Sequence, residues 1–79
     1  MSELQLAENI KTLRQKKGLS QWQVSRILKF KGNMCGVWER RIAMPSNQCV
    51  INLSQLFGTT INDLVRKDLS KVFTINSQN

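Results

Sequence analysis

The residues of this 79-residue chain that most clearly suggest a chemistry are its Lys and Arg side chains, which cluster in the middle of the sequence. Between Asn9 and Gly58 a single acid, Glu39, stands against nine cations: Lys11, Arg14, Lys16, Lys17, Arg26, Lys29, Lys31, Arg40 and Arg41. That segment carries +8, and the residues outside it sum to −1. Such a concentration favours a polyanionic partner, because each neutralised phosphate releases condensed counterions. A basic surface that is merely solvated is the alternative.

Other reactive groups are scarce. The chain has no His, and its two cysteines, Cys35 and Cys49, are fourteen positions apart. These residues cannot supply a four-ligand zinc site, a His-based triad or a His general base, and Glu39 is a lone carboxylate. We therefore expect no enzymatic activity, no metal and no cofactor. Both cysteines are expected to be reduced, Cys35 in the core and Cys49 half-buried.

Start and stop signals, together with apolar residues at helical spacing, divide the chain into five short helices. We expect them over residues 3–17, from the Ser20 cap to about 28, around 35–40, between the Ser46 cap and Gly58, and from Thr60 onward. Their inward-facing residues are expected to be Leu6, Ile10, Leu13, Val24, Leu28, Cys35, Trp38, Val50, Leu53, Phe57, Ile61, Leu64 and Val65. Because residues 29–31 allow only a tight turn, the second and third helices are predicted to form a helix-turn-helix.

The length of the chain is enough for one core. We expect a single all-α domain over residues 1–69 and a tail over 70–79, which is either flexible or pairs across a dimer through its β-favouring run 72–75. No uncharged apolar run approaches the roughly 18 residues of a membrane span. The N-terminus begins acidic and lacks a continuous apolar stretch, so we expect no signal or transit peptide and a cytoplasmic location.

Four segments carry a family resemblance: Ile10-Lys-Thr-Leu-Arg-Gln-Lys-Lys-Gly-Leu-Ser-Gln21, Trp38-Glu-Arg, Pro45-Ser and Leu53-Ser-Gln-Leu-Phe-Gly-Thr-Thr-Ile-Asn-Asp-Leu64. Together, over roughly residues 6–69, they resemble the DNA-binding domain of phage lambda-type repressors and Cro-like bacterial regulators, the XRE family. The resemblance implies a compact five-helix lambda-repressor-like bundle. Its third helix would lie in the major groove of operator DNA, and its second helix would cross the DNA backbone.

The resemblance also implies which residues face the bases: Gly32, Asn33, Gly36 and Val37. Lys31, at the entrance of the helix, would contact a phosphate or a guanine. Asn33, Val37 and Arg40 follow one another at spacings of four and three, and therefore share a helix face opposite Cys35 and Trp38. Asn pairs with adenine N6 and N7, and Val contacts the thymine methyl, so this face favours half-sites that contain A·T pairs. An ordinary helix surface is the alternative for Asn33 and Val37.

A second group of residues is expected to contact the DNA backbone: Gln21, as the resemblance implies, and Trp22, Arg40 and Arg41. Gln21 would bind a phosphate at the start of the second helix. Trp22 is expected to be partly exposed, and it packs on sugar and phosphate, on a protein partner, or on Lys and Arg stems of its own surface. Arg41 stands where the family commonly has Gly, and it contacts phosphate or the minor groove unless it is simply a solvated helix end.

Some positions match the family pattern and others depart from it. Arg14 and Glu39 match a structural ion pair between the first and third helices of family members. Lys29 stands where the family usually has Gly in the left-handed region, so backbone strain is expected there. Gly32 and Gly36 each cost about 1 kcal/mol relative to Ala in a helix and offer no base-reading side chain. Either they allow close approach to DNA, or the third helix serves another partner.

The expected function is a sequence-specific double-stranded DNA-binding regulator of transcription in a bacterium or phage-infected cell. A small phage-type or mobile-element repressor, binding an inverted-repeat operator as a homodimer, fits best. Its dimer interface would use Ile61 and Leu64, as in the family, or the run 72–75. One alternative is a helix-turn-helix used as a protein-interaction module, antitoxin-like or antirepressor-binding, which Gly32, Gly36 and Trp22 favour. The other is a nonspecific, nucleoid-type DNA binder.

Overall fold

Three helices begin at the caps that the sequence predicts, Ser20, Ser46 and Thr60. The computed structural model describes residues 3–67, and its elements are α1 (Glu3–Lys16), α2 (Gln21–Ile27), α3 (Met34–Glu39), α4 (Asn47–Phe57) and α5 (Ile61–Arg66). The all-α class predicted from the sequence is confirmed, and α1 ends one residue before the predicted Lys17. The Ser2 cap, the domain boundary at Leu69, the tail 70–79 and its run 72–75 lie outside the described residues.

The start of each of α2, α4 and α5 is fixed by a hydroxyl side chain. Ser20 Oγ accepts a hydrogen bond from the backbone N–H of Gln23 at 3.0 Å, and the Gln23 side chain accepts from the Ser20 N–H at 2.7 Å, which completes a capping box. Ser46 and Thr60 accept from the N–H three residues further on, at 3.2 and 3.0 Å. Such a cap contributes about 1 kcal/mol, so these boundaries are encoded locally.

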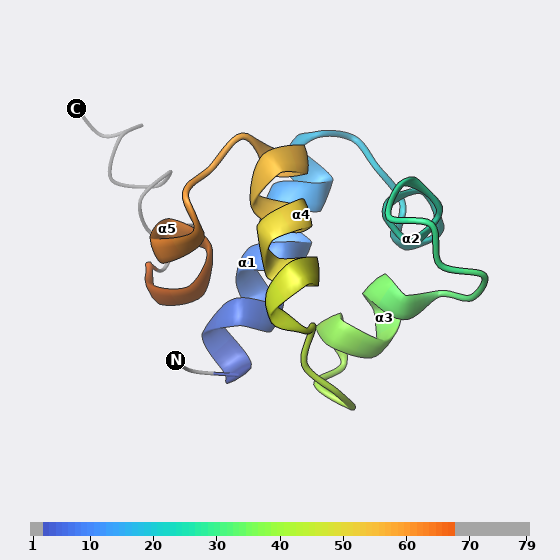
Figure 1. Ribbon diagram of the computed structural model, residues 1–79, viewed down its shortest axis with the longest axis horizontal. Coiled ribbons are helices and arrows are strands. Elements are labelled where there is room, and N and C mark those ends of the chain that lie inside the picture. The colour runs from blue at the N-terminus through green and yellow to red at the C-terminus, as the bar shows by residue number, and fades with distance from the viewer. Residues whose placement is uncertain (1–2, 68–79) are drawn as a thin grey trace.

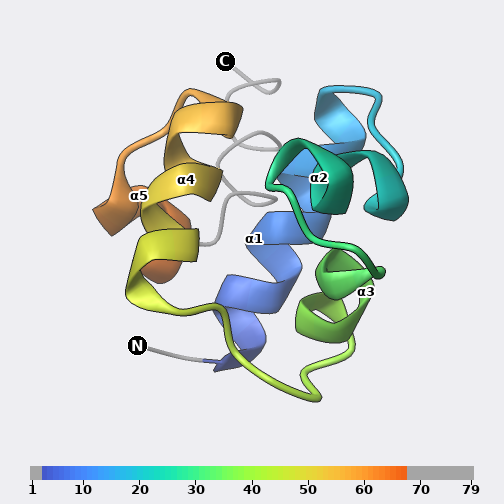
Figure 2. The ribbon, with the colours of Figure 1, turned by 45° about the vertical axis from the view of Figure 1, so that its right-hand side comes forward.

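The long helix α1 is the centre of the bundle. It contacts α3, α4 and α5, and α2 packs mainly on α3. In Figure 2, α4 and α5 lie on one side of α1, and α2 and α3 lie on the other. Figure 1 shows the same division, with α5 at one end of the molecule and α2 at the other. The helices α2 and α3 therefore form one side of the fold, away from α5.

A single core joins the helices, and it contains almost all the residues predicted to face inward. The buried residues are Leu6, Ile10, Leu13, Val24, Cys35, Trp38, Val50, Leu53, Phe57, Leu64 and Val65, and Leu28 packs against them at the edge. Ile61 was predicted to face inward and does not, since 45% of it is exposed. It is the first residue of a six-residue helix and lies beside Asn47 and Ile51 at the rim of the core.

Asn9 is a polar residue that lies buried among these apolar groups. Its Nδ2 donates to the carbonyl oxygens of Leu64 at 2.7 Å and Lys67 at 2.6 Å, and its Oδ1 accepts from Gln5 at 3.0 Å. Asn9 thus ties α1 to the last turn of α5, where helix carbonyls have no partner within the helix. Across residues 3–67, none of the helices combines the length and the apolar character needed to cross a lipid bilayer.

Candidate nucleic-acid interface

The helices α2 and α3 are held together through the short connection of residues 28–33. Phe30 packs its ring edge-on against Trp38, with the ring centroids 5.6 Å apart. The buried Ser25 bridges the two helices, because its Oγ accepts from the Cys35 N–H at 2.9 Å and donates to the Gln21 carbonyl at 2.9 Å. These contacts fix the start of α3 against the middle of α2.

A chain of side-chain hydrogen bonds crosses the same boundary, and we call Glu39, Gln21 and Asn33 the amide relay. Gln21 Nε2 donates to Glu39 Oε1 at 3.0 Å, and Gln21 Oε1 accepts from Asn33 Nδ2 at 3.0 Å. Asn33 Oδ1 in turn accepts from the backbone N–H of Gly36 at 3.1 Å. Gln21 and Glu39, 18 positions apart in sequence, are therefore in direct contact.

The relay ends on an ion pair that connects α1 to α3. Arg14 donates to both carboxylate oxygens of Glu39, at 2.7 and 3.1 Å, and to the Leu19 carbonyl at 2.9 Å. The Arg14 and Glu39 side chains are 12% and 5% exposed. Burial alone would raise the pKa of Glu39, but hydrogen bonds from Arg14, Gln21 and Cys35 outweigh it and hold that pKa below its ordinary value. The hydrogen bond to Glu39 raises the pKa of Arg14.

Gly36 has a role that the sequence did not reveal. It is buried, and a Cβ at this position would lie 2.6 Å from Asn33 Nδ2 and 2.7 Å from Gln21 Oε1. Gly36 therefore makes room for the amide relay, and it is buried beside the two amides instead of exposed on the face predicted for it. A Cβ at Gly32 would meet no atom within 4 Å, and Gly32 is exposed.

Asn33 also differs from its expected place. It is the N-cap of α3, with φ −82° and ψ 69°, so it precedes the helix instead of lying on its face. The backbone N–H of Gly36 holds its Oδ1, and Gln21 Oε1 holds one of its two amide hydrogens. The preference of Asn for N-cap positions is the sequence signal that could have placed it there. Val37 is half-buried within α3, and Gln21, at the start of α2, is half-buried too.

Exposed cations surround α3. Lys29 and Lys31 lie in the connection before it, Arg40 and Arg41 follow it, and Arg26 is in the last turn of α2. Within residues 3–67, none of these five side chains is paired with an acid. Since Glu39 is already bound to Arg14, this side of the molecule presents unneutralised positive charge.

Two of these cations occupy left-handed backbone, a conformation that favours glycine. The ends of α1, α2, α3 and α4 share one pattern, in which two successive N–H groups bond back to the last turn around a residue with positive φ. That residue is Gly18 after α1 and Gly58 after α4, with φ of 71° and 67°. It is Lys29 after α2 and Arg41 after α3, with φ of 70° and 62°. The strain expected at Lys29 is therefore found, and Arg41 shares it.

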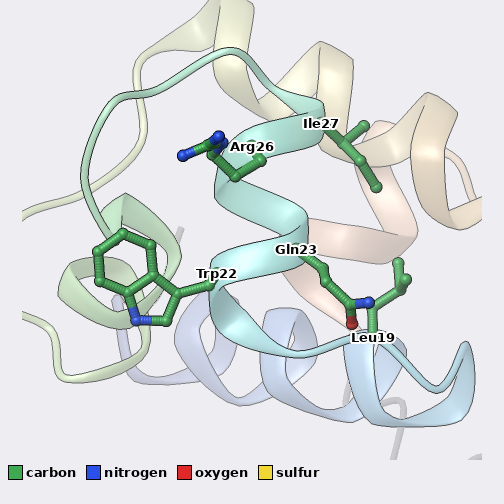
Figure 3. Close-up of a pocket in the computed structure, with 5 residues that line it drawn as sticks. All are labelled: Leu19, Trp22, Gln23, Arg26 and Ile27. Atoms are coloured by element: carbon green, nitrogen blue, oxygen red, sulfur yellow. The ribbon is translucent and has the colours of Figure 1, made fainter.

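The outer side of α2 carries a small apolar surface, which we call the α2 patch. Its residues are Leu19, Trp22, Gln23, Arg26 and Ile27. Trp22 is 53% exposed, in agreement with the sequence, and Ile27 is 50% exposed. Figure 3 shows Trp22 and Arg26 extending from one side of α2, and Gln23 and Ile27 from the other.

The cysteines are not arranged for chemistry. Both are free thiols, with Cys35 buried and Cys49 half-buried as expected. Burial, together with the hydrogen bond that Cys35 Sγ donates to Glu39 at 3.2 Å, raises the pKa of Cys35 to about 12, so its reactive thiolate is disfavoured. Among residues 3–67, no cluster of three His, Cys, Asp or Glu side chains could hold a metal ion.

Comparison with known proteins identified no relative: no family model matches the chain, and neither a curated protein nor a solved structure matches it.

Proposed function

We propose that this chain is a sequence-specific double-stranded DNA-binding regulator, in which α2 and α3 act as a helix-turn-helix and α3 enters the major groove. The observation that carries the proposal is the set of exposed, unpaired cations on both sides of α3. An α-helix with its side chains is about 10–12 Å across, which fits a groove about 12 Å wide. Lys31, Gly32, Asn33 and Val37 are then the base-facing candidates that are exposed or half-buried. Gln21, Trp22, Arg40 and Arg41 are the backbone contacts.

The left-handed Lys29 and Arg41 favour this proposal over a merely solvated basic surface. Glycine serves the same backbone geometry at Gly18 and Gly58, so the fold itself does not require a cation there. A non-glycine residue in this conformation costs about 1–2 kcal/mol. Strain that persists beside a charged surface is typical of functional positions. Both side chains would neutralise DNA phosphates next to the groove that holds α3.

Selection of binding sites from a random duplex pool tests the proposal. An enriched inverted repeat, with half-sites about one helical turn apart, would support a regulator that binds as a dimer. Equal recovery of unrelated duplexes would leave the nonspecific alternative instead. A repressor acts by occupying its operator, so the selected site should block transcription when placed across a promoter.

Glycine substitutions separate DNA contact from folding. Lys29→Gly and Arg41→Gly should each reduce the slope of log K against log salt by about 0.9, as the loss of one phosphate contact does. They should also stabilise the fold by about 0.5–1 kcal/mol, because relief of the left-handed strain exceeds the entropy that glycine adds to the unfolded chain. Lys67→Gln removes one positive charge at the C-cap of α5, a helix that lies on the opposite side of α1 from α2 and α3, and should leave the slope unchanged.

The homodimer stays part of the proposal, with one change to its expected interface. Leu64 is fully buried, so it cannot contact a second copy. The exposed Ile61 borders a shallow apolar depression lined by Asn47, Val50, Ile51 and Val65, which is the better candidate surface on α4 and α5. Sedimentation of the wild type against Ile61→Lys would show whether this surface holds a dimer.

A protein-interaction role is the second candidate, and the α2 patch favours it. A surface centred on Trp22 and Ile27 buries apolar area on binding, and large aromatic side chains often dominate such contacts. Binding through the patch would be lost in Trp22→Ala and would depend little on salt. Binding to DNA would instead weaken steeply as the salt concentration rises.

A further inference from the structure

The hydrogen bonds of the amide relay have a fixed direction, which starts at Glu39. Its carboxylate can only accept, and it faces the Gln21 amide nitrogen. The Gln21 oxygen must then face Asn33 Nδ2, and the Asn33 oxygen faces the Gly36 N–H, which can only donate. Neither amide can flip without placing two donors or two acceptors together at one of these contacts.

This direction turns the Asn33 oxygen toward the buried Gly36 and Ser25, where it accepts from the Gly36 N–H at 3.1 Å and lies 3.4 Å from Ser25 Oγ, and it leaves hydrogen on the nitrogen to donate. Each amide nitrogen carries two hydrogens, and the relay uses one of the two on Asn33. Both Asn33 and Gln21 are half-buried, so part of each residue is exposed, and the second hydrogen of each amide nitrogen is not used within the relay. Pairing with adenine at N6 and N7 needs the Asn oxygen as acceptor as well as the nitrogen as donor.

We propose that Gly36 and the amide relay lock Asn33 as a hydrogen-bond donor only, so that it reads an acceptor on the base edge and gains nothing from the amino group of adenine. This inference rests on the proposed DNA-binding function and replaces the adenine pairing expected from the sequence. Guanine, with its adjacent O6 and N7 acceptors, is the base best suited to such a donor, and thymine O4 is the next. Gly36 is thereby a specificity-determining residue that acts by positioning and touches no base.

The absence of a side chain at Gly36 allows the Asn33 and Gln21 amides to keep these positions. An added Cβ would meet the far ends of two flexible side chains, Asn33 and Gln21, so these amides would move while the helix remains. Gly36→Ala therefore releases Asn33 and should preserve the fold. Gly32→Ala adds the same methyl group one turn earlier, where it meets nothing, and serves as the matched control.

The lock can be tested first in the free protein. In NMR spectra, the side-chain amide signals of Gln21 and Asn33 should be dispersed and exchange slowly with solvent. Gly36→Ala should shift both signals toward those of solvated amides, and Gly32→Ala should leave them in place. Solvated amide signals in the wild type, or equal responses to the two substitutions, would overturn the lock without reference to DNA.

Binding to the selected duplex tests the base that is read. Asn33→Ser keeps a capping hydroxyl and removes the amide. The base pair at which this variant loses its base preference is therefore the one that Asn33 faces. We expect guanine or thymine there in the wild type. Gly36→Ala should relax that preference about three- to tenfold, the value of one hydrogen bond. Gln55→Ala, at an exposed position on α4, should leave it unchanged.

The inference would be overturned if the selected base is adenine and affinity falls when that adenine is replaced by purine, which lacks the amino group. Asn33 would then be using its oxygen as an acceptor. A wild type that enriches no motif would instead overturn the proposed function, and the base reading with it. The amide signals would still decide separately whether Gly36 holds the relay.

Discussion

Removal of the Glu39 carboxylate is the perturbation with the largest expected effect on stability. In Glu39→Ala the Arg14 guanidinium keeps its charge but loses its partner, and its side chain is only 12% exposed. Stranding one member of a buried ion pair costs about 3–5 kcal/mol. Arg14 retains its hydrogen bond to the Leu19 carbonyl, so we expect the lower value, about 3 kcal/mol. Domains of this size unfold with about 4–12 kcal/mol, and the melting temperature should fall by about 12–24 °C.

Urea denaturation followed by circular dichroism at pH 7 measures this loss. The Lys67–Asp63 pair is the internal reference, because it is exposed, lies at i and i+4, and measures 3.3 Å. Lys67→Ala should cost less than about 0.5 kcal/mol. The double substitution of Arg14 and Glu39 by Met should be less harmful than Glu39→Ala, since it strands no charge. A cost in Glu39→Ala no larger than in Lys67→Ala would refute the burial argument.

Three further predictions follow from the same contacts. Because the pKa of Glu39 is lowered on folding, the unfolded state takes up more protons below about pH 5, so stability should fall as the pH falls and do so less steeply in Glu39→Gln. At pH 8 a disulfide reagent should titrate Cys49 in the folded protein and Cys35 only after unfolding, since the pKa of Cys35 is about 12; two fast thiols would contradict this. Asn9→Ala removes the side-chain donor from the carbonyls of Leu64 in α5 and of Lys67 just after it, and should cost about 2 kcal/mol in urea denaturation, against less than about 0.5 kcal/mol for the exposed Gln48→Ala.

The helix boundaries could be predicted from the sequence because their signals are local. Ser20, Ser46 and Thr60 each bond to a backbone N–H three residues away, and Gly18 and Gly58 supply the left-handed residue that ends a helix. No information from distant parts of the chain is needed for such contacts. The apolar stripes were likewise enough to identify the buried faces of α1 and α4.

The exceptions depend on contacts that are distant in sequence. Ile61 shares the helical spacing of Leu64 and Val65, but whether its face is covered depends on where α4 ends relative to α5. Asn9 interrupts the apolar stripe of α1 between Leu6 and Ile10, and only the carbonyls of α5, more than fifty residues away, explain its burial. Its place within an apolar face was the available signal.

The candidate site also depends on contacts between residues that are distant in sequence. Arg14, Gln21, Asn33, Gly36 and Glu39 received separate roles from their positions in the sequence, as an ion pair, a phosphate anchor and base readers. In the structure they form one hydrogen-bonded unit, whose direction is fixed by an acceptor at one end and a backbone donor at the other. Periodicity and motif spacing carry no information about which side-chain atom donates and which accepts in these hydrogen bonds. If α3 reads DNA, the bases it prefers therefore depend on Glu39 and Gly36, neither of which needs to touch a base.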